Sequence, residues 1–342
     1  MPVESEELNR AIEHLVRLVN APSVTGSEGP AVDEAERIAR DELQIPVSRM
    51  EAEPGRDNLL VGDRDPRVIL CTHLDTVPPH IDASLSETHV RGRGACDAKG
   101  IAIAMLYATA RLWSRGEGDG LACLLVVGEE STHCGAVAAA ASDLRPDHII
   151  LGEPCGLDPA LAQKGLLKLR VSAKGFSGHS AYPELGVSAI HRLLDAVERL
   201  KRVDLPSDPS LGPTTMNVGR IEGGVAANVI APSAEATLLF RCAAPVDAIL
   251  AEIRSRVGSL VELDELNRAE PYGFDVLGLK PGPAVPFNTD AHSLLELGAS
   301  MSLMGPGDMR CAHSAREELA FSDLADGIEA YERVVAGLLG LA

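Results

Sequence analysis

The chain has 342 residues, of which 45% are hydrophobic and 24% are charged, and its formal net charge at pH 7 is −19. This charge repels nucleic acids and anionic membrane surfaces, so we expect neither as a partner. The amino terminus, residues 1–10, is polar and acidic and has no apolar signal core, and no later uninterrupted apolar span is long enough for a membrane. The seven cysteines form no C-x-x-C pair, so the sequence predicts a cytoplasmic protein with free thiols. The length exceeds that of one typical core and predicts two domains.

Helices and buried strands alternate in the first half of the chain. Amphipathic helices are predicted over 5–19 and 31–43, and an apolar helix begins at 101. Short strands, most of them continuous apolar runs, are predicted at 58–62, 68–70, 121–127 and 148–151. This alternation is typical of an α/β domain with a mostly parallel sheet.

Side chains that can bind metal follow these strands where each one ends. His73 and Asp75 lie two residues apart after one strand, so both point the same way in an extended backbone, as a metal-bound imidazole and its orienting carboxylate would. The adjacent carboxylates Glu129 and Glu130 follow the next strand, and Glu153 follows a third. The alternatives are an incidental histidine beside a loop aspartate and a set of solvated loop acids. Ligands of open α/β sheets gather at such strand ends.

Asp97 stands behind flexible glycines at the start of the predicted apolar helix. Its alternative role is that of an N-cap, which aspartate fills well. His313 lies beyond another strand-like run at 301–304. Two imidazoles and three carboxylates therefore form one candidate ligand set: His73, Asp97, Glu130, Glu153 and His313. Such nitrogen and oxygen ligands suit a pair of zinc-like divalent ions with one bridging carboxylate.

The pattern changes after residue 164 to the alternation of half-exposed strands. We predict strands at 167–174, 215–221 and 234–242 and helices at 187–201 and 246–257. These elements indicate a ferredoxin-like β-α-β-β-α-β domain, residues 166–283, inserted into a catalytic domain formed by residues 1–165 and 284–342. A closing amphipathic helix is predicted over 321–339.

Five motifs occur in an order and spacing that resemble a known family. They read CTHLDTVPP, GRGACDAKG, GEES, LGEP and GPGDMRCAHSAREE. They resemble the dinuclear zinc amidohydrolases and metallopeptidases that include acetylornithine deacetylase, succinyl-diaminopimelate desuccinylase, aminoacylase and the glutamate carboxypeptidases. The resemblance extends over nearly the whole chain. It implies a zinc-peptidase-like catalytic domain and an inserted lid or dimerisation domain.

The resemblance also implies a metal-binding role for each matching residue. His73 and Glu153 would hold one Zn²⁺, Glu130 and His313 would hold the other, and Asp97 would bridge them. Each subunit would therefore carry two Zn²⁺ ions, for which Co²⁺ could substitute.

The remaining catalytic roles follow from the same resemblance. Asp75 would orient the first histidine, and Glu129 would be the general base that takes a proton from the attacking water. His179 would reach across a homodimer, formed through the inserted domains, to the developing oxyanion. Asn228 and Arg241 would bind the substrate, and Arg241 suits a bidentate contact with its carboxylate.

The substrate implied by the resemblance is a small N-acylated amino acid. The segment Gly305 to Asp308 and the later Glu317 look most like the acetylornithine deacetylase branch. Hydrolysis of an N-acetylornithine-type amide is therefore the first expectation. The alternatives are a succinyl-diaminopimelate desuccinylase, a dipeptidase or carboxypeptidase of the same family, and a metal-binding homologue without catalysis.

Overall fold

The computed structural model describes residues 2–341, which form two compact units. Unit 1 contains residues up to 161 together with 274–282 and 289 onwards, and unit 2 contains 162–273 and 283–288. None of the helices in the described range is long and apolar enough to cross a membrane.

The main sheet of unit 1 has the strand order β1-β2-β6-β3-β7-β16. Its bounds are β1 Val47–Glu53, β2 Arg56–Gly62, β3 Val68–His73, β6 Leu121–Val126, β7 His148–Leu151 and β16 Ser300–Leu303. The last four strands of this order run parallel, and β1 and β2 are antiparallel. Every residue of β3, β6 and β7 is buried, as expected for a parallel sheet covered on both faces. The predicted mostly parallel α/β sheet is confirmed.

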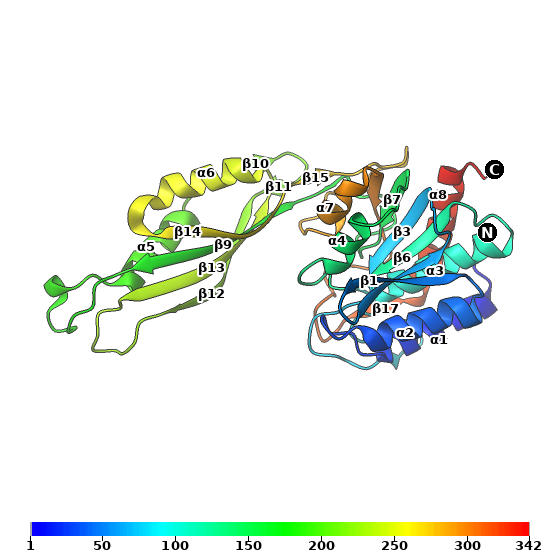
Figure 1. Cartoon of the computed structure of the whole chain (residues 1–342), viewed down its shortest axis with the longest axis horizontal. Helices are drawn as coiled ribbons and strands as arrows, with labels where there is room; N and C mark the ends of the chain where they lie inside the picture. The colour runs from blue at the N-terminus through cyan, green and yellow to red at the C-terminus, as the bar shows by residue number, and fades with distance from the viewer. Residues whose placement is uncertain (1, 342) are drawn as a thin grey trace. The chain divides into compact units, whose positions relative to one another are not determined.

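Helices cover this sheet in Figure 1. They are α1 Ser5–Asn20, α2 Gly29–Arg37, α3 Lys99–Ser114, α4 Cys134–Ala140, α7 Ala291–Leu294 and α8 Phe321–Leu339, with single turns at Ile38–Glu42 and Leu295–Leu297. Helix α3 packs against α1, α8 and the sheet, and it is buried over most of its length. A helix that is apolar on all sides needs this central position.

A small three-stranded sheet in unit 1 has the order β17-β5-β4. Its strands are β4 Ser84–Leu85, β5 His89–Arg91 and β17 Glu318–Ala320. The antiparallel pairing of β17 with β5 joins segments that are far apart in the sequence, with Glu318 opposite Arg91. It therefore places the loop before α3 beside the loop before β17.

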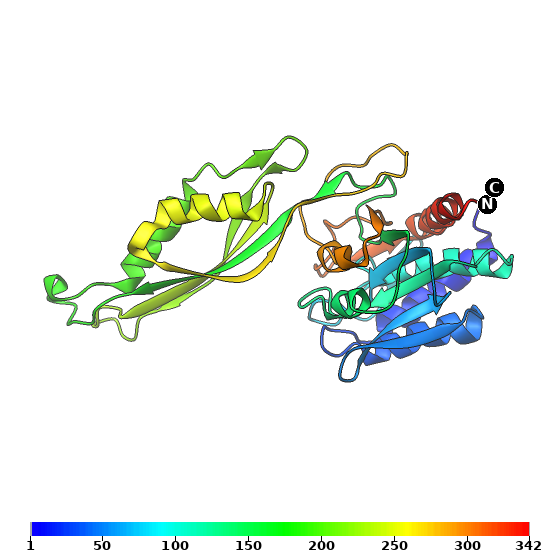
Figure 2. The ribbon, with the colours of Figure 1, turned by 45° about the horizontal axis from the view of Figure 1, so that its top comes forward.

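Unit 2 contains a four-stranded antiparallel sheet with the order β12-β13-β9-β14. Its strands are β9 Gly165–Lys174, β12 Thr215–Gly223, β13 Ser233–Cys242 and β14 Glu262–Ala269, and its helices are α5 Ala189–Lys201 and α6 Val246–Val257. Figure 2 shows α5 and α6 side by side on one face of this sheet. Burial alternates along β9 and β13, because only the face under the helices is covered. The predicted β-α-β-β-α-β order is confirmed.

Unit 2 also contains short elements that connect the larger ones. They are β8 Ala162–Gln163, β10 Ser207–Asp208, β11 Gly212–Pro213 and β15 Tyr272–Gly273, and the helical turns Pro183–Leu185 and Gly258–Leu260. Strand β8 pairs with β15, and β10 pairs with β11.

Candidate metal centre

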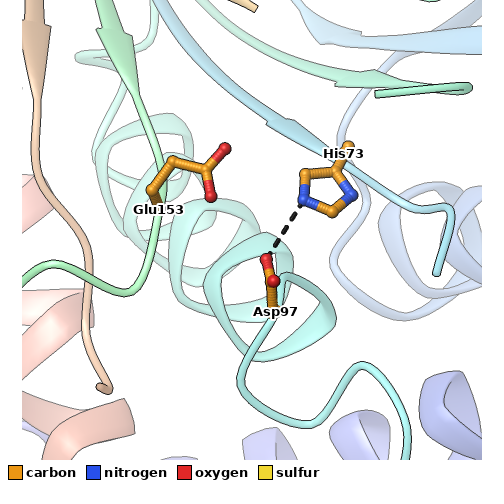
Figure 3. A group of neighbouring side chains, drawn as sticks. All are labelled: His73, Asp97 and Glu153. Atoms are coloured by element: carbon orange, nitrogen blue, oxygen red, sulfur yellow. Dashed lines mark hydrogen bonds and ion pairs between the residues drawn. The ribbon is translucent and has the colours of Figure 1, made fainter. Parts of the chain in front are cut away.

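The ends of two neighbouring strands and the loop before α3 bring three of the predicted ligands together. His73 is the last residue of β3, and Glu153 follows the parallel neighbour β7 by two residues. Asp97 lies two residues before α3. One ligand atom of each residue lies within 4.8 Å of the other two, and all three residues are buried (Figure 3). We call His73, Asp97 and Glu153 the first group.

A second set of three residues shares Asp97 with the first. Ligand atoms of Asp97, Glu130 and His313 also lie within 4.8 Å of one another, and we call these residues the second group. The His313 Nε2 atom lies 2.8 Å from Glu130 Oε1 and 3.1 Å from Asp97 Oδ2. In contrast to the buried first group, the His313 side chain is 48% exposed. The structure thus brings together all five predicted ligands.

Asp97 does not cap α3, so that alternative is wrong. The N-cap position is Ala98, and no side chain makes a capping hydrogen bond there. The Asp97 carboxylate lies between two imidazoles, with Oδ1 3.3 Å from His73 Nε2 and Oδ2 3.1 Å from His313 Nε2. Each carboxylate oxygen therefore faces a different group, as in a bridging ligand.

Burial and contacts between charged groups shift pKa values in both groups. Burial raises the pKa of the Glu153 carboxyl well above its ordinary value, and the negative charges of Glu129 and Asp97 add to the rise. Burial disfavours a charged His73, but hydrogen bonds to two aspartates outweigh this effect and raise its pKa well above the ordinary value. Hydrogen bonds to the carboxylates of the second group raise the pKa of His313 to about 10.

This donor set fits a pair of divalent cations. Three carboxylates and two imidazoles form two groups that share Asp97, and the ligand atoms within each group lie within 4.8 Å of one another. Three of the five residues are buried. So many acids are costly to bury unless a proton or a cation compensates their charge. Protons on the imidazoles provide part of this compensation, and a zinc-like cation bound by the same atoms would displace them.

The Asp75 carboxylate contacts more than the histidine it was predicted to orient. His73 Nδ1 lies 3.0 Å from the backbone oxygen of Asp75 and 3.5 Å from its Oδ1. The same buried carboxylate accepts hydrogen bonds from the backbone N–H groups of Glu129, at 3.0 Å, and Glu130, at 3.1 Å. Thr25 Oγ1 donates a further bond, at 2.7 Å. Asp75 therefore fixes the peptide segment that carries both adjacent acids.

Glu129 belongs to neither of the two groups, although it lies next to Glu130. Its carboxylate is within 4.8 Å of ligand atoms of His133 and Asp290. His133 Nδ1 lies 2.8 Å from Asp290 Oδ1. These two neighbours were not predicted as part of the site. His133 lies four residues after Glu129, just before α4, and Asp290 lies just before α7, which packs against α4.

The predicted substrate-contacting residues all lie in unit 2. His179 is exposed, its Nδ1 accepts a hydrogen bond from Ala181 N, and it forms a β-bridge with Val229, next to Asn228. Arg241 is near the opposite end of β13, where it pairs with Thr215 of β12. The eight residue steps from Ser233 to Arg241 span roughly 25 Å of extended strand. Within one chain, His179 and Asn228 are therefore far from Arg241.

Comparison with known proteins identifies the family. Residues 161–264 match the model of a peptidase dimerisation domain. A peptidase M20 domain-containing protein of Schizosaccharomyces pombe is 34% identical over 331 residues, which cover 93% of this chain and 82% of that protein. The chain belongs to the M20 peptidase family. A protein of Aspergillus flavus named probable carboxypeptidase is 33% identical over 314 residues, which cover 80% of this chain and 73% of its own length.

This M20 chain also has the fold of solved members of the family. A Bacillus subtilis protein described as a dinuclear metal binding peptidase from the M20 family superposes with a TM-score of 0.72 and 15% identity, covering 97% of this chain and 99% of its own. The predicted family and hydrolytic class are confirmed, and M20 metallopeptidases are metal-dependent. The acetylornithine deacetylase branch is not supported by the relatives, whose names describe peptidases and carboxypeptidases.

Proposed function

We propose that this M20 enzyme hydrolyses the amide bond that precedes a free α-carboxylate in a small peptide or N-acylated amino acid. The observation that carries the proposal is the pair of donor groups that share Asp97. His73 and Glu153 would hold one cation and Glu130 and His313 the other, with zinc as the first candidate. When bound, the cations would polarise the scissile carbonyl and make a water molecule easier to deprotonate.

In this proposal, Glu129 moves the protons. Its carboxylate is absent from the two groups that share Asp97, although it forms a third candidate donor group with His133 and Asp290, and Asp75 fixes its backbone N–H. It would accept a proton from the attacking water and donate it to the leaving amine. Glu130, whose N–H is held by the same aspartate, would bind the cation. Two adjacent acids on one fixed turn would therefore have separate tasks.

The substrate class can be tested with a matched panel of small amides. The panel contains dipeptides, tripeptides, N-acetylornithine, other N-acetyl amino acids and N-succinyl-diaminopimelate, and the control for each compound is its α-carboxamide. With Zn²⁺ or Co²⁺ added, we expect amine release from the peptides with a free carboxylate and much slower release from their amides. Equal rates on acids and amides would contradict the carboxylate requirement. Preference for N-acetylornithine over every peptide would restore the deacetylase expectation.

We further propose that two copies associate through unit 2. Strand β12 is an edge strand that is exposed at almost every position. Its side chain Ile221 is 52% exposed, and Leu194 on the adjoining helix α5 is 49% exposed. Apolar side chains beside an open strand edge favour pairing with another chain. A homodimer would bury them.

The separation within unit 2 supports a site shared between two copies. His179 and Asn228 lie far along β13 from Arg241, so one chain cannot direct all three at a single small substrate. In the proposed homodimer, the partner's His179 would donate to the oxyanion, and Arg241 of the first chain would bind the substrate carboxylate. Such a donor to the oxyanion contributes about 10² to 10³ in turnover.

The shared site can be tested by subunit exchange. His179→Ala chains and Glu129→Gln chains should each be inactive alone. A heterodimer of the two would combine the intact metal centre of one chain with the intact His179 of the other, so activity should reappear. If verified heterodimers remain as inactive as both parents, His179 does not act on the partner's site.

A further inference from the structure

Unit 1 contains a buried ion pair that contacts the loops carrying Asp97 and His313. Arg93 Nη1 is 2.6 Å from Glu317 Oε2, and each residue is only 2% exposed. Burying two charges costs more than their attraction returns unless further hydrogen bonds satisfy the remaining atoms. The partners of those remaining atoms therefore indicate what the pair does.

The second oxygen of Glu317 binds the loop that carries Asp97. Glu317 Oε1 accepts backbone N–H groups from Gly94 at 2.8 Å, Asp97 at 3.1 Å and Cys96 at 3.3 Å. One carboxylate oxygen thus gathers three amides of a single turn, as in other anion-binding arrangements of successive N–H groups. It fixes the backbone of the residue common to both donor groups.

Arg93 connects the same turn to two other loops. Its Nη1 donates to the backbone oxygen of Ser314, next to His313, at 3.3 Å. Its Nε donates to the backbone oxygen of Pro79, in the loop after β3, at 3.3 Å. The guanidinium therefore contacts the loop after His73 and the loop of His313, while Glu317 holds the turn of Asp97.

We propose that Arg93 and Glu317 form a clamp of two positioning residues that sets the separation between Asp97 and His313. The proposal rests on the metal-binding function proposed above, and it adds which residues maintain the cation site that contains His313, which we expect to be the weaker of the two. The sheet itself holds His73 and Glu153, whereas His313 lies in a loop four residues before Glu317. Loss of the clamp should therefore affect the second group more than the first.

The test variant is Glu317→Gln, which keeps the size of the side chain and one oxygen acceptor but leaves Arg93 without its counter-charge. The matched control is Glu332→Gln in α8. Glu332 is also buried, at 6% exposed, and it accepts hydrogen bonds from Arg111 and Arg115, each at 2.7 Å. Both substitutions remove a buried carboxylate from ion pairs, but only the first one touches the ligand loops.

Two measurements separate positioning from general stability. Hydrogen exchange of the metal-free protein reports on the amides of Gly94, Cys96 and Asp97, and Co²⁺ titration, followed by absorption and calorimetry, reports both cation affinities. For Glu317→Gln, we expect at least tenfold faster exchange at these amides and an about 10- to 100-fold loss in the weaker Co²⁺ affinity, the range typical of residues that orient metal ligands. The turnover number should fall with little change in KM. Glu332→Gln should change none of these.

The outcomes distinguish the clamp from the proposed function. A wild-type chain that bound no Co²⁺ would overturn the proposed function. A wild-type chain that bound two ions, and a Glu317→Gln chain with unchanged affinities and exchange, would overturn only the clamp. If Glu317→Gln does not fold, Arg93→Lys is the second variant. It keeps the charge but cannot reproduce the bonds to Ser314 and Pro79 together, so the same loss at the weaker site is expected, and its absence would contradict the clamp.

Discussion

The two groups that share Asp97 are held by different kinds of structure. His73 ends strand β3, Glu153 follows its parallel neighbour β7, and both are buried, at 1% and 6% exposed. The second group instead depends on loops, and the side chain of His313 is 48% exposed. Strand ends in a packed sheet cannot move without disturbing the core, whereas loops open at lower cost. The comparison therefore predicts a tight first site and a weaker, more exchangeable second site.

The first group is therefore suited to holding a cation firmly, and the second group is suited to leaving room for substrate. A site closed on all sides by protein is suited to retention, while a catalytic site needs an open position. The His313 side chain is partly exposed, so solvent and substrate can reach the second group. Because His313 lies in a loop and not at the end of a strand, the Arg93–Glu317 clamp holds its position instead.

The largest effect is expected from the two adjacent acids. Glu129→Gln should retain both cations and lose about 10² to 10⁴ in turnover, because only the general base is removed. Glu130→Gln should lose the weaker cation. Metal analysis and steady-state kinetics of the two purified variants check this. If Glu129→Gln lost metal and Glu130→Gln retained it, Glu129 would be the cation ligand and Glu130 the general base.

Removal of one ligand from each group should sharpen the contrast between the sites. His313→Gln should bind one Co²⁺ ion per chain with near-normal affinity, because the first group is intact. Glu153→Gln should weaken the tighter of the two sites. Calorimetric titration of the metal-free variants measures both. If His313→Gln weakened the tighter site as much as Glu153→Gln does, the two groups would not be separable.

A smaller effect is expected on substrate binding by Arg241. Arg241→Lys should raise KM roughly tenfold or more for substrates with a free α-carboxylate, because a point charge cannot replace two parallel hydrogen bonds. The metal content should not change. Arg256→Lys on the exposed surface of α6 is the matched control. Unchanged kinetics of Arg241→Lys would remove this residue from the site.

The smallest effect concerns the stability of the metal-free protein at alkaline pH. The pKa of His313 is raised from 6.5 to about 10, first by its bond to Asp97 and then by its bond to Glu130. A raised folded-state pKa gives stability that is complete below about pH 6.5 and is lost as the pH rises through about 10. The melting temperature of the metal-free wild type should therefore fall more over this window than that of His313→Gln. If the melting temperatures of the two proteins changed with pH in parallel, a charged His313 would not stabilise the metal-free protein.

Regular elements of the fold were predictable where one periodic pattern filled them. The helices predicted over 246–257 and 321–339 are α6 and α8, and the buried runs became β3, β6 and β7. Other parts carried no such pattern. Strand β1 has no fully buried position, and β5 and β17 contain three residues each, so neither shows a hydrophobic period. The predicted helix over 31–43 is correct in place, but it continues from α2 into a π-helical turn at Ile38–Glu42.

The candidate site was predictable only where its chemistry is local in the sequence. An imidazole or a carboxylate at a strand end is visible from the residue type and the preceding apolar run, as for His73 and Glu153. The clamp is not visible in this way. Glu317 meets the amides of Gly94 and Asp97 across more than 200 residues of chain. The pairing of β5 with β17 brings these segments together, and a contact between a side chain and the backbone leaves no motif on the backbone side.

The central claim is that two cations, bound unequally by groups that share Asp97, support hydrolysis. It is tested most directly by adding Zn²⁺ stepwise to the metal-free protein while bound metal and peptide hydrolysis are measured in the same samples. The account predicts two ions per chain with different affinities, and full activity only when the weaker site is also filled. Full activity in a chain that holds no metal would contradict the account.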